Sequence, residues 1–396
     1  MVNDPENSPN KVGAVLVVGG GIAGIQASLD LAEAGYKVYL AEKRSAIGGH
    51  MAQLDKTFPT NDCAMCTISP KLVDAARHLN IEVLTNTDIL DISGSAGAFT
   101  VKTGKRPRYI DPAKCTACGD CEKACPVEIV GKFDEGLVRQ KAAHKLYPQA
   151  VPNAYAIDKI GVSPCRDACP AGQRAQGYIA HIRNGDYEAA MRTIKLDNPF
   201  PGICGRICNH RCEDACNRGN LDEPLDIRAL KRFVTDKAYE TPYQPPERAE
   251  RKFTEKIAVV GSGPCGLTAA RDLILEGYEV TVYEALPVAG GMLRVGIPAY
   301  RLPTSIIDRE IREIEDLGVK INLSHAVEDV DELFGAGYGA VLIAVGAHEG
   351  IRLPIPGSEL PGVFTNTSFL RDVRLGQPPD LGDKVIVIGA GDVAMD

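Results

Sequence analysis

The sequence predicts an α/β protein with two Rossmann-like units separated by a cysteine-rich segment. Two observations support this fold class. A glycine fingerprint occurs twice, at Gly19, Gly21 and Gly24 and again, with the same spacing, at Gly261, Gly263 and Gly266. All but one of the 13 cysteines lie between the two copies. A repeat of this length indicates a duplicated structural unit rather than a chance cluster of glycines.

Both copies have the sequence context of a dinucleotide site. The apolar runs AVLVV and IAVV precede the glycines and predict buried parallel strands, and a helical stretch follows each fingerprint. Such glycines let the backbone approach a pyrophosphate at the amino end of the helix. Glu42 and Glu284 end the next predicted strand, where a carboxylate accepts hydrogen bonds from a ribose and disfavours a 2′-phosphate. These features predict FAD or NAD, rather than NADP, at both units.

A second pair of glycines favours FAD. Gly48 and Gly49 follow the first acid, and Gly290 and Gly291 follow the second at the same distance. This position resembles the one at which flavoproteins of the thioredoxin reductase and glutathione reductase type bring a second backbone loop to FAD. We therefore expect two FAD-binding units of that type.

Composition limits the classes of function. The 396 residues carry a net charge of −8, which leaves no basic surface for nucleic acid. No apolar run is long enough to span a membrane, and the polar start MVNDPENSPNK is not a signal peptide. We expect a cytoplasmic protein, in which cysteines serve metal or redox chemistry rather than structural disulfides.

The cysteines at 115–125 give the strongest metal prediction. Cys115, Cys118, Cys121 and Cys125 precede Pro126 in the CxxCxxCxxxCP pattern of bacterial ferredoxins. In this pattern three thiolates bind one [4Fe-4S] cluster, and the fourth usually serves a neighbouring cluster. A zinc site would prefer two CxxC pairs further apart.

The cluster of this run needs a fourth ligand from elsewhere. Cys169, which is also followed by proline, is the first candidate, and Cys63 and Cys66 of the segment TNDCAMC are the alternatives. A CxxC pair is also compatible with a dithiol redox couple, or with two small buried residues.

A third group of cysteines lies in a segment with helical periodicity. It comprises Cys165, Cys169, Cys204, Cys208, Cys212 and Cys216. The last four are spaced every fourth residue, on one side of a helix or on successive turns. We expect at least one further [4Fe-4S] cluster, with zinc a stronger alternative than in the ferredoxin run because the spacing is unusual for both metals.

The last motif predicts a nicotinamide site. Gly389, Gly391 and Ala394 form a GxGxxA pattern after the predicted strand KVIVI, in the position expected for NAD(P)H. The sequence stops inside the helix that should follow. We therefore expect a fragment of a longer protein that binds NAD(P)H poorly as it stands.

From about residue 13 to 158 the chain resembles the A subunit of heterodisulfide reductase. The motifs that carry the resemblance are IGGHMAQLDKTFPTNDCAMCTISPKLVDAARH, PRYIDPAKCTACGDCEKACPVE and YPQAVPNAYAID. The resemblance implies a flavin-bearing subunit that exchanges electrons with hydrogenase or formate dehydrogenase modules, ferredoxin and thiol or disulfide acceptors. In that family the chain returns after the ferredoxin insert to complete the FAD domain, so we expect the first unit here to be incomplete.

From about residue 161 onwards the chain resembles the amino-terminal half of dihydropyrimidine dehydrogenase and the small subunit of glutamate synthase. PCRDACPAG, CGRICNHRCEDACNRG, VGSGPCGLTAARDL and GGMLRVGIPAYRLP carry this resemblance. It implies that Cys165, Cys169, Cys208, Cys212 and Cys216 are cluster ligands, with a less clear role for Cys204. Ile157 and Ile160 stand where that family has two further cysteines, which leaves open whether one cluster or two assemble.

These observations give the expected domain order. We expect a polar tail over 1–12, a first, incomplete FAD-binding unit over 13–108, a ferredoxin-like [4Fe-4S] segment over 109–160, an α-helical iron-sulfur domain over 161–240, a linker over 241–254, and a second FAD-binding unit with the start of an NAD(P)-binding domain over 255–396.

The leading functional hypothesis is an iron-sulfur flavoprotein oxidoreductase that passes electrons from NAD(P)H through FAD and [4Fe-4S] clusters to a heterodisulfide reductase-like or ferredoxin-type acceptor. Hydride transfer to flavin needs no amino-acid acid or base, so no catalytic side chain is assigned. The alternatives are a non-catalytic electron-transfer subunit, an electron-input module like the glutamate synthase small subunit, and a zinc-binding scaffold.

Overall fold

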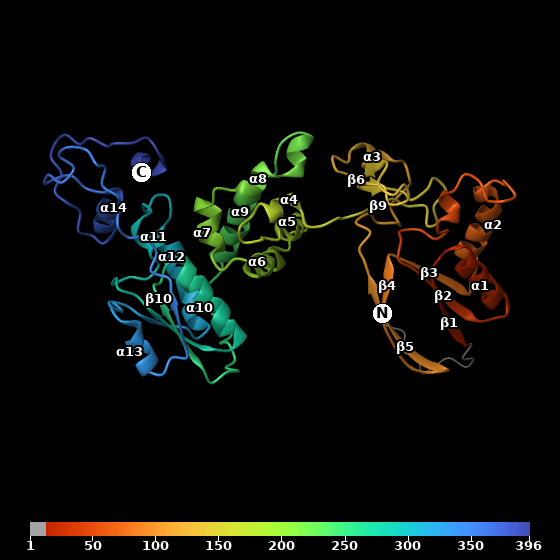
Figure 1. The fold of residues 1–396 in the computed structure, drawn as a ribbon, viewed down its shortest axis with the longest axis horizontal. Helices are drawn as coiled ribbons and strands as arrows, with labels where there is room; N and C mark the ends of the chain where they lie inside the picture. The colour runs from red at the N-terminus through yellow and green to blue at the C-terminus, as the bar shows by residue number, and fades with distance from the viewer. Residues whose placement is uncertain (1–12) are drawn as a thin grey trace. The chain divides into compact units, whose positions relative to one another are not determined.

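A computed structural model describes residues 13–396, so the predicted polar tail over 1–12 lies outside the described residues. The chain divides into two compact units, Met1–Val162 and Ser163–Asp396. Each unit contains one of the two glycine fingerprints. Figure 1 shows the fold and labels many of its elements. No helix of the described part is long and apolar enough to cross a membrane.

The first unit is built on a small parallel sheet. Its strands are β1 (Ala14–Val18), β2 (Lys37–Glu42) and β3 (Ile81–Thr85), in the order β1-β2-β3. Helices α1 (Ile22–Glu33) and α2 (Ala64–Arg77) and the short 3-10 helix η1 (Met51–Gln53) accompany the sheet. Apolar side chains from these elements, including Ile25, Leu40 and Ile68, are fully buried together. The first predicted strand–turn–helix unit is therefore formed.

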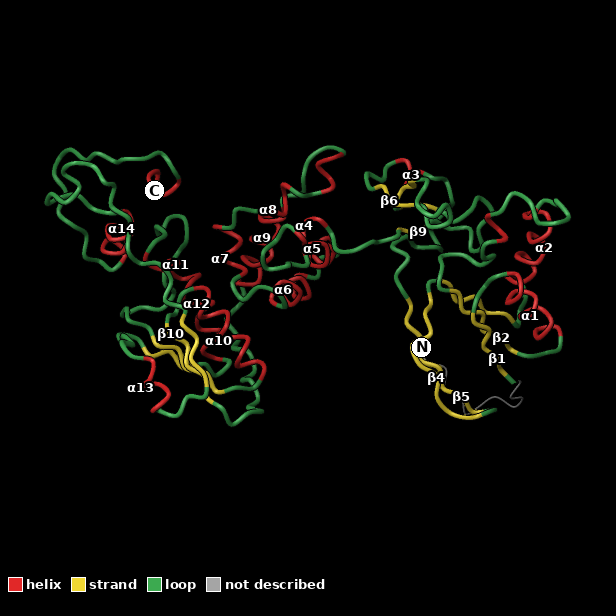
Figure 2. The backbone as a smooth tube through the Cα atoms, viewed as in Figure 1, coloured by secondary structure: helices red, strands yellow, loops and turns green. Residues whose placement is uncertain are grey.

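The rest of the first unit consists of short elements. Strands β4 (Thr87–Ser95) and β5 (Ala98–Lys105) form an antiparallel hairpin. The ferredoxin-like segment follows, and Figure 2 shows that loops and turns make up much of it. Its regular elements are α3 (Asp120–Lys123), β6 (Glu128–Val130), β7 (Arg139–Lys141), β8 (Ala143–His144) and β9 (Ala156–Ile157).

The second unit begins with short helices, as the sequence predicts for this segment. They are α4 (Pro164–Asp167), α5 (Ala175–Arg183), α6 (Tyr187–Lys195), α7 (Pro201–Ile207), α8 (Arg211–Asp214), the 3-10 helix η2 (Asn217–Asn220) and α9 (Ile227–Glu240). Tyr178 is completely buried among them, and its hydroxyl donates a hydrogen bond of 3.2 Å to the carbonyl of Ile227. This bond ties α5 to the start of α9.

A second parallel sheet carries the second fingerprint. Its strand order is β12-β11-β10-β13, with β10 (Lys256–Val260), β11 (Glu279–Tyr283), β12 (Lys320–Asn322) and β13 (Ala340–Ile343). The helices of this part are α10 (Pro264–Glu276), α11 (Met292–Val295), α12 (Thr304–Asp316) and α13 (Val330–Gly335). Strand β10 therefore has hydrogen-bonded neighbours on both sides, β11 and β13.

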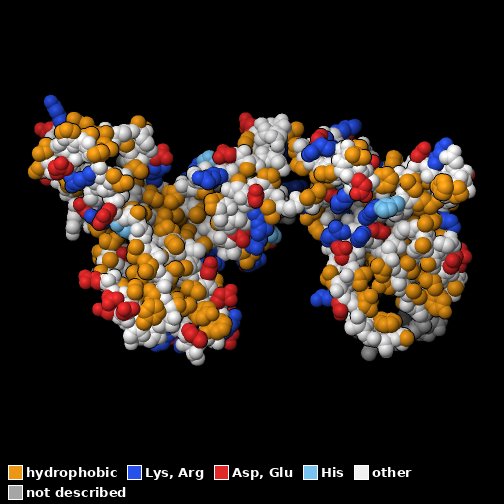
Figure 3. Space-filling model, in the orientation of Figure 1, with side chains coloured by type: hydrophobic (Ala, Val, Ile, Leu, Met, Phe, Trp, Pro, Cys, Tyr) orange, Lys and Arg blue, Asp and Glu red, His pale blue; other side chains and the backbone are white. Residues whose placement is uncertain are grey.

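The equivalent strand of the first unit has a neighbour on one side only. β1 pairs with β2, and no described strand occupies the place that β13 takes beside β10. As a result Val18 is 63% exposed, whereas Val260 at the matching position is 8% exposed. Hydrophobic side chains are visible on the surface over β1 and β2 (Figure 3). β1 is therefore an open edge among the described residues, and the incompleteness of the first unit stays a prediction.

One expected strand is absent from the described residues. The sequence predicts a strand over KVIVI, residues 384–388, but the structure assigns none there. The flanking helices α14 (Asn366–Arg374) and α15 (Asp392–Met395) are present. The physical reason is that no described strand lies beside 384–388 to share backbone hydrogen bonds, and Ile386 remains 89% exposed.

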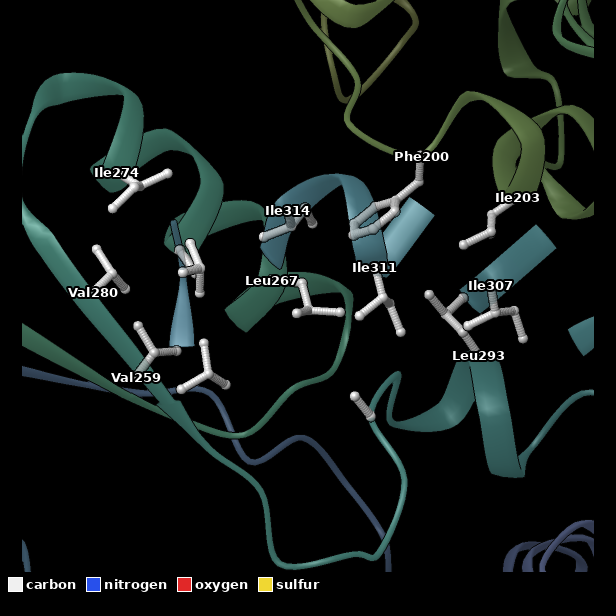
Figure 4. Close-up of a cluster of buried hydrophobic side chains, with 14 of the residues drawn as sticks. Phe200, Ile203, Val259, Leu267, Ile274, Val280, Leu293, Ile307, Ile311 and Ile314 are labelled. Atoms are coloured by element: carbon white, nitrogen blue, oxygen red, sulfur yellow. The ribbon is translucent and has the colours of Figure 1, made fainter. Parts of the chain in front are cut away.

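The helical segment and the second dinucleotide unit share one hydrophobic core. Phe200 and Ile203 from the helical segment project toward Ile307 and Ile311 of α12 (Figure 4), and all four are buried. The cluster continues through Leu267 of α10 to the sheet. Because the packing is continuous, the two parts form one packed body rather than two domains on a flexible linker.

A buried carboxylate reinforces this junction. Glu310 of α12 is completely buried, and it accepts hydrogen bonds from the backbone N–H groups of Gly202 at 2.5 Å and Ile203 at 3.1 Å. The hydroxyl of Tyr239 also donates to it, at 2.8 Å. Glu310 therefore takes the place of an N-terminal cap on α7, although it comes from another helix.

Titration of Glu310 should make the stability of the second unit depend on pH. Burial raises the pKa of Glu310 to about 7, against the opposing effect of its hydrogen bonds. The folded protein then binds more protons than the unfolded chain between about pH 4.5 and pH 7, so the free energy of unfolding falls as pH rises through that range, by about 3 kcal/mol at most. Urea denaturation at several pH values measures the slope.

Glu310→Gln should remove this contribution to the slope, because the amide does not ionise. The exposed Glu276→Gln on α10 serves as the matched control and should keep the wild-type slope. Equal slopes in wild-type protein and Glu310→Gln would show that Glu310 does not titrate in this range.

Candidate functional site

The glycine loops have the shape of dinucleotide cradles. Gly21 and Gly263 are the N-caps of α1 and α10, and a Cβ built on either one meets no atom within 4 Å. A Cβ on Gly24 or Gly266 would instead lie 1.9 or 2.0 Å from the carbonyl oxygen of the first glycine of the loop. The third glycine is therefore required for packing, and the second leaves open space in front of the free N–H groups of the helix.

The acids predicted to bind ribose brace these loops. The backbone N–H groups of Gly20 and Arg44 each donate to the carboxylate of Glu42 at 2.7 Å. In the second unit the N–H groups of Ser262 and Leu286 donate to Glu284 at 2.9 and 2.8 Å. Their role in binding ribose stays a prediction. The bracing role is one that the sequence pattern did not reveal.

The later glycine pairs pack against the same loops. A Cβ on Gly49 would lie 3.0 Å from the Cα of Gly21, and a Cβ on Gly291 would lie 2.7 Å from the Cα of Gly263. Both pairs have positive φ angles, of 116° and 61° at Gly48 and Gly49 and of 119° and 52° at Gly290 and Gly291. Any side chain here would push the second loop away from the first. In both predicted sites, the second glycine loop thus packs directly against the first.

The two cradles differ at the first glycine. A Cβ on Gly261 would lie 2.4 Å from the carbonyl oxygen of Ala344, which follows β13, whereas a Cβ on Gly19 meets nothing within 4 Å. The second cradle is therefore closed on a side where the first is open. Of the two, the second is the better formed FAD site.

The GxGxxA motif has only part of the expected geometry. Gly391 is the N-cap of α15, which contains Ala394, and Gly389 has a φ of 121°. A Cβ on Gly391 meets nothing within 4 Å. The turn and the helix start thus match those of the two flavin loops, but the strand before them is not formed.

Three cysteines of the ferredoxin run lie close together. Burial raises the pKa of Cys121, and the charges of Cys115 and Cys118 add to the shift. Cys125 makes a separate contact, with its thiol donating to the carbonyl of Val127 at 3.5 Å. The three-plus-one use of these cysteines stays a prediction.

Cys63 and Cys66 form a local pair at the start of α2. The backbone N–H of Cys66 donates to the sulfur of Cys63, the N-cap residue, at 3.3 Å. Both side chains are exposed, which excludes the interpretation as two small buried residues. Hydrogen bonds from the side chain and backbone of Cys66 lower the pKa of Cys63. Ligand and redox roles both stay open.

Four cysteines of the helical segment line one pocket. Cys165 lies on α4 and Cys169 just after it, while Cys208 is the C-cap of α7 and Cys212 lies on α8. The rest of the lining is half apolar and half polar, and its two cationic residues are Arg211 of α8, which is exposed, and Lys231 of α9, which is buried. Cysteines every fourth residue therefore lie on successive turns, not on one helix. Cys169 has three cysteine neighbours in its own unit, which argues against its expected use as the fourth ligand of the ferredoxin run.

The other two cysteines of this group do not line the pocket. Cys204 packs against the shared hydrophobic core, and its thiol donates to Oδ1 of Asn198 at 3.7 Å. Burial raises its pKa to about 11. Cys216 is the N-cap of η2. Spacing alone could not separate these two from Cys208 and Cys212, because the four are evenly spaced from 204 to 216.

The four cysteines of the pocket match the number of thiolate ligands of one cubane cluster. Within residues 13–396, no group of three or more histidine, cysteine, aspartate or glutamate side chains is arranged to hold a metal ion. In a cubane cluster each thiolate binds a different iron, so its ligands surround a wider space. Four thiols that line one pocket provide such a ligand set.

The glycine geometry leads to a test of the second flavin site. Gly266→Ala should destabilise the protein by about 2 kcal/mol or more, because its Cβ collides with backbone. Gly263→Ala should change the stability of the apoprotein by no more than about 1 kcal/mol, yet weaken FAD binding about tenfold, because its Cβ enters the open space.

Urea denaturation and flavin content measure the two effects. Gly335→Ala on α13, where a Cβ also meets nothing, is the control and should leave both unchanged. If Gly263→Ala bound FAD as tightly as the wild type, the space beside Gly263 would not be the dinucleotide site.

The comparisons with known families cover most of the chain. Residues 14–74 match the family described as FAD dependent oxidoreductase, and residues 108–130 match the 4Fe-4S binding domain. Residues 141–243 match dihydropyrimidine dehydrogenase domain II, 4Fe-4S cluster, and residues 255–396 match pyridine nucleotide-disulphide oxidoreductase. These matches confirm the predicted fold class and cofactor classes.

Characterised relatives match different parts of the chain. The NADP(+)-dependent formate dehydrogenase subunit beta of Moorella thermoacetica is 42% identical over 59% of this chain and 37% of its own length. The second iron-sulfur A subunit of CoB--CoM heterodisulfide reductase from Methanopyrus kandleri is 54% identical over 36% of this chain and 22% of its own length. The NADPH-Fe(3+) oxidoreductase subunit beta of Geobacter sulfurreducens is 37% identical over 61% of this chain and 37% of its own length.

The chain thus matches well under two thirds of the length of each of these relatives. Both resemblances inferred from the sequence motifs are nevertheless confirmed. Along this chain, a part similar to the A subunit of heterodisulfide reductase is joined to a segment that matches the dihydropyrimidine dehydrogenase iron-sulfur domain and to a segment that matches the pyridine nucleotide-disulphide oxidoreductase family.

Proposed function

We propose that this chain carries electrons between NAD(P)H and [4Fe-4S] clusters by way of FAD, and delivers them to a heterodisulfide reductase-like or ferredoxin-type acceptor. The observation that carries the proposal is the shared core between the four-cysteine pocket and the second flavin cradle. Phe200 and Ile203 of the helical segment pack directly on α12 of the flavin part. The distance between the two sites is therefore fixed by packing.

When bound, FAD and the clusters supply the redox chemistry itself. The protein's own residues have three tasks. The glycine loops hold the dinucleotide, with Glu284 bracing the second loop. Cys165, Cys169, Cys208 and Cys212 surround the second cluster site, and Tyr178 and Ile227 form part of its apolar wall. An apolar wall limits water access and so tunes the potential.

We further propose that the chain works as part of a larger redox complex in the cytoplasm. The relatives named above are subunits of formate dehydrogenase, heterodisulfide reductase and NADPH-Fe(3+) oxidoreductase. Hydrogenase or formate dehydrogenase modules, heterodisulfide reductase subunits and ferredoxin are the corresponding partner classes. The 13 cysteines, all free, suit a reducing compartment.

A second candidate function is a non-catalytic electron-transfer subunit, or an input module like the glutamate synthase small subunit. The observation that favours a non-catalytic role is the GxGxxA motif, which lacks a formed strand before Gly389. Such a protein would exchange electrons with partner proteins only, without oxidising a nicotinamide itself.

Anaerobic reduction of the full chain separates these functions. With cofactors reconstituted, NADH or NADPH should bleach the flavin absorbance and then produce the electron paramagnetic resonance signal of reduced clusters. If dithionite reduced both centres while neither nicotinamide did, the non-catalytic subunit would be the correct interpretation. A colourless protein that contains zinc would support the third alternative, a zinc-binding scaffold without redox function.

Iron analysis tests the assignment of ligands. Cys165→Ser, Cys169→Ser, Cys208→Ser and Cys212→Ser should each lose about four irons per chain, the content of one cubane cluster. Cys204→Ser and Cys216→Ser are matched controls from the same segment and should keep the wild-type iron content. An equal loss in Cys216→Ser would restore Cys216 to the ligand set, as its correspondence to the family's ligands implies.

A further inference from the structure

A buried lysine lines the four-cysteine pocket. Lys231 of α9 is only 6% exposed and belongs to the pocket lining together with Cys165, Cys169, Cys208 and Cys212. Its ammonium group forms no ion pair and no side-chain hydrogen bond with any residue of the described part, 13–396, and its nitrogen is not among the fully buried, unpartnered side-chain nitrogens of that part. The charge of Lys231 nevertheless acts on Cys212, where it opposes the effect of burial on the thiol pKa.

An ammonium group in such a place needs a counterion. A buried charge without a partner costs several kcal/mol, and long side chains usually avoid that cost by pairing or by extending to water. The carboxylate nearest in sequence to the pocket cysteines, Glu213, is engaged elsewhere. It accepts from the N–H of Arg228 at 2.7 Å and lies 3.0 Å from the His210 ring. The buried Glu310 is likewise engaged, by the N–H groups of Gly202 and Ile203 and the hydroxyl of Tyr239. The pocket that Lys231 lines is a place where an anion would supply the counterion.

The chemistry of the pocket identifies that charge. A cubane cluster ligated by four thiolates is anionic, and it gains one more negative charge on reduction. A fixed positive charge beside it therefore stabilises the reduced form more than the oxidised form. Burial strengthens the effect, because little water screens the interaction.

We infer that Lys231 is the buried counterion of the cluster in the four-cysteine pocket and raises its reduction potential. The inference rests on the proposed function, because it needs a cluster at this site. It adds a role for a residue that is not a ligand. With Lys231 in place the cluster accepts electrons more readily, which favours electron flow from the second flavin into the helical segment.

Lys231→Met tests the charge while keeping an unbranched side chain of similar length. The midpoint potential of the cluster is measured in the full, cofactor-loaded chain by a titration followed by electron paramagnetic resonance. At a fixed solution potential, the ratio of reduced to oxidised cluster should fall about tenfold, equivalent to a shift of about 59 mV to more negative values for one electron.

Lys237→Met is the matched control. Lys237 lies on the same helix, but it is exposed and bonded to Glu240, so its removal makes the same change in net charge away from the pocket. Its midpoint potential should equal that of the wild type. Lys231→Arg retains the positive charge, so its midpoint potential should lie close to that of the wild type.

The apoprotein gives a second readout that does not involve redox chemistry. Without a cluster, Lys231→Met removes an uncompensated buried charge, so the apoprotein should be at least as stable as wild type in urea. A residue needed only for packing would lose stability in both forms.

The outcomes separate the inference from the proposed function. If Lys231→Met retained its iron and its potential equalled that of Lys237→Met, the inference alone would be overturned. If Cys208→Ser lost no iron, the cluster assignment would fail and the inference with it. Loss of the cluster in Lys231→Met but not in Lys231→Arg would support a counterion, whereas loss in both would indicate a packing role and overturn the inference.

Discussion

The junction between α7 and α12 is the constraint on which the rest of the second unit depends. Glu310 binds the free N–H groups at the start of α7, and the other end of the same short helix presents Cys208 to the pocket. Phe200 and Ile203 fill the apolar space around this contact. A helix of two turns, held at its start by the flavin part, thus positions a cysteine of the iron-sulfur segment. The position of the four-cysteine pocket relative to the second glycine cradle follows from this packing.

Comparing the two copies of the repeat shows which features of the glycine loops depend on the local motif and which depend on neighbouring strands. Gly24 and Gly266 make the same close approach to a carbonyl, and Glu42 and Glu284 brace their loops in the same way. These features depend on residues within one strand–turn–helix unit, so they repeat faithfully. The environment of Gly19 and Gly261 differs, because β13 comes from a distant part of the chain and lies only beside β10.

The same distinction explains how much could be predicted from sequence. The paired glycine loops follow from short-range spacing, and the structure forms them. The use of the ferredoxin-run cysteines is predicted from spacing in the same way and stays a prediction. The choice of Cys208 and Cys212 over Cys204 and Cys216 depends on where α7 ends and which face packs on α12, which no local spacing records. The strand at 384–388 needs a neighbour for its backbone groups, so apolar composition alone does not form it.

Lys231 occupies a position at which the helical periodicity of α9 calls for an apolar residue. Ile227, Lys231 and Val234 lie on one face of the helix at the spacing of a buried stripe, and all three are buried. A lysine on such a stripe is expensive unless an anion faces it. The same helix buries the apolar residues that fix α5 and α6, so the charge cannot withdraw without disturbing the fold. The fold therefore holds a positive charge at the place where thiolates converge, and packing and electrostatics at this pocket are set by one helix.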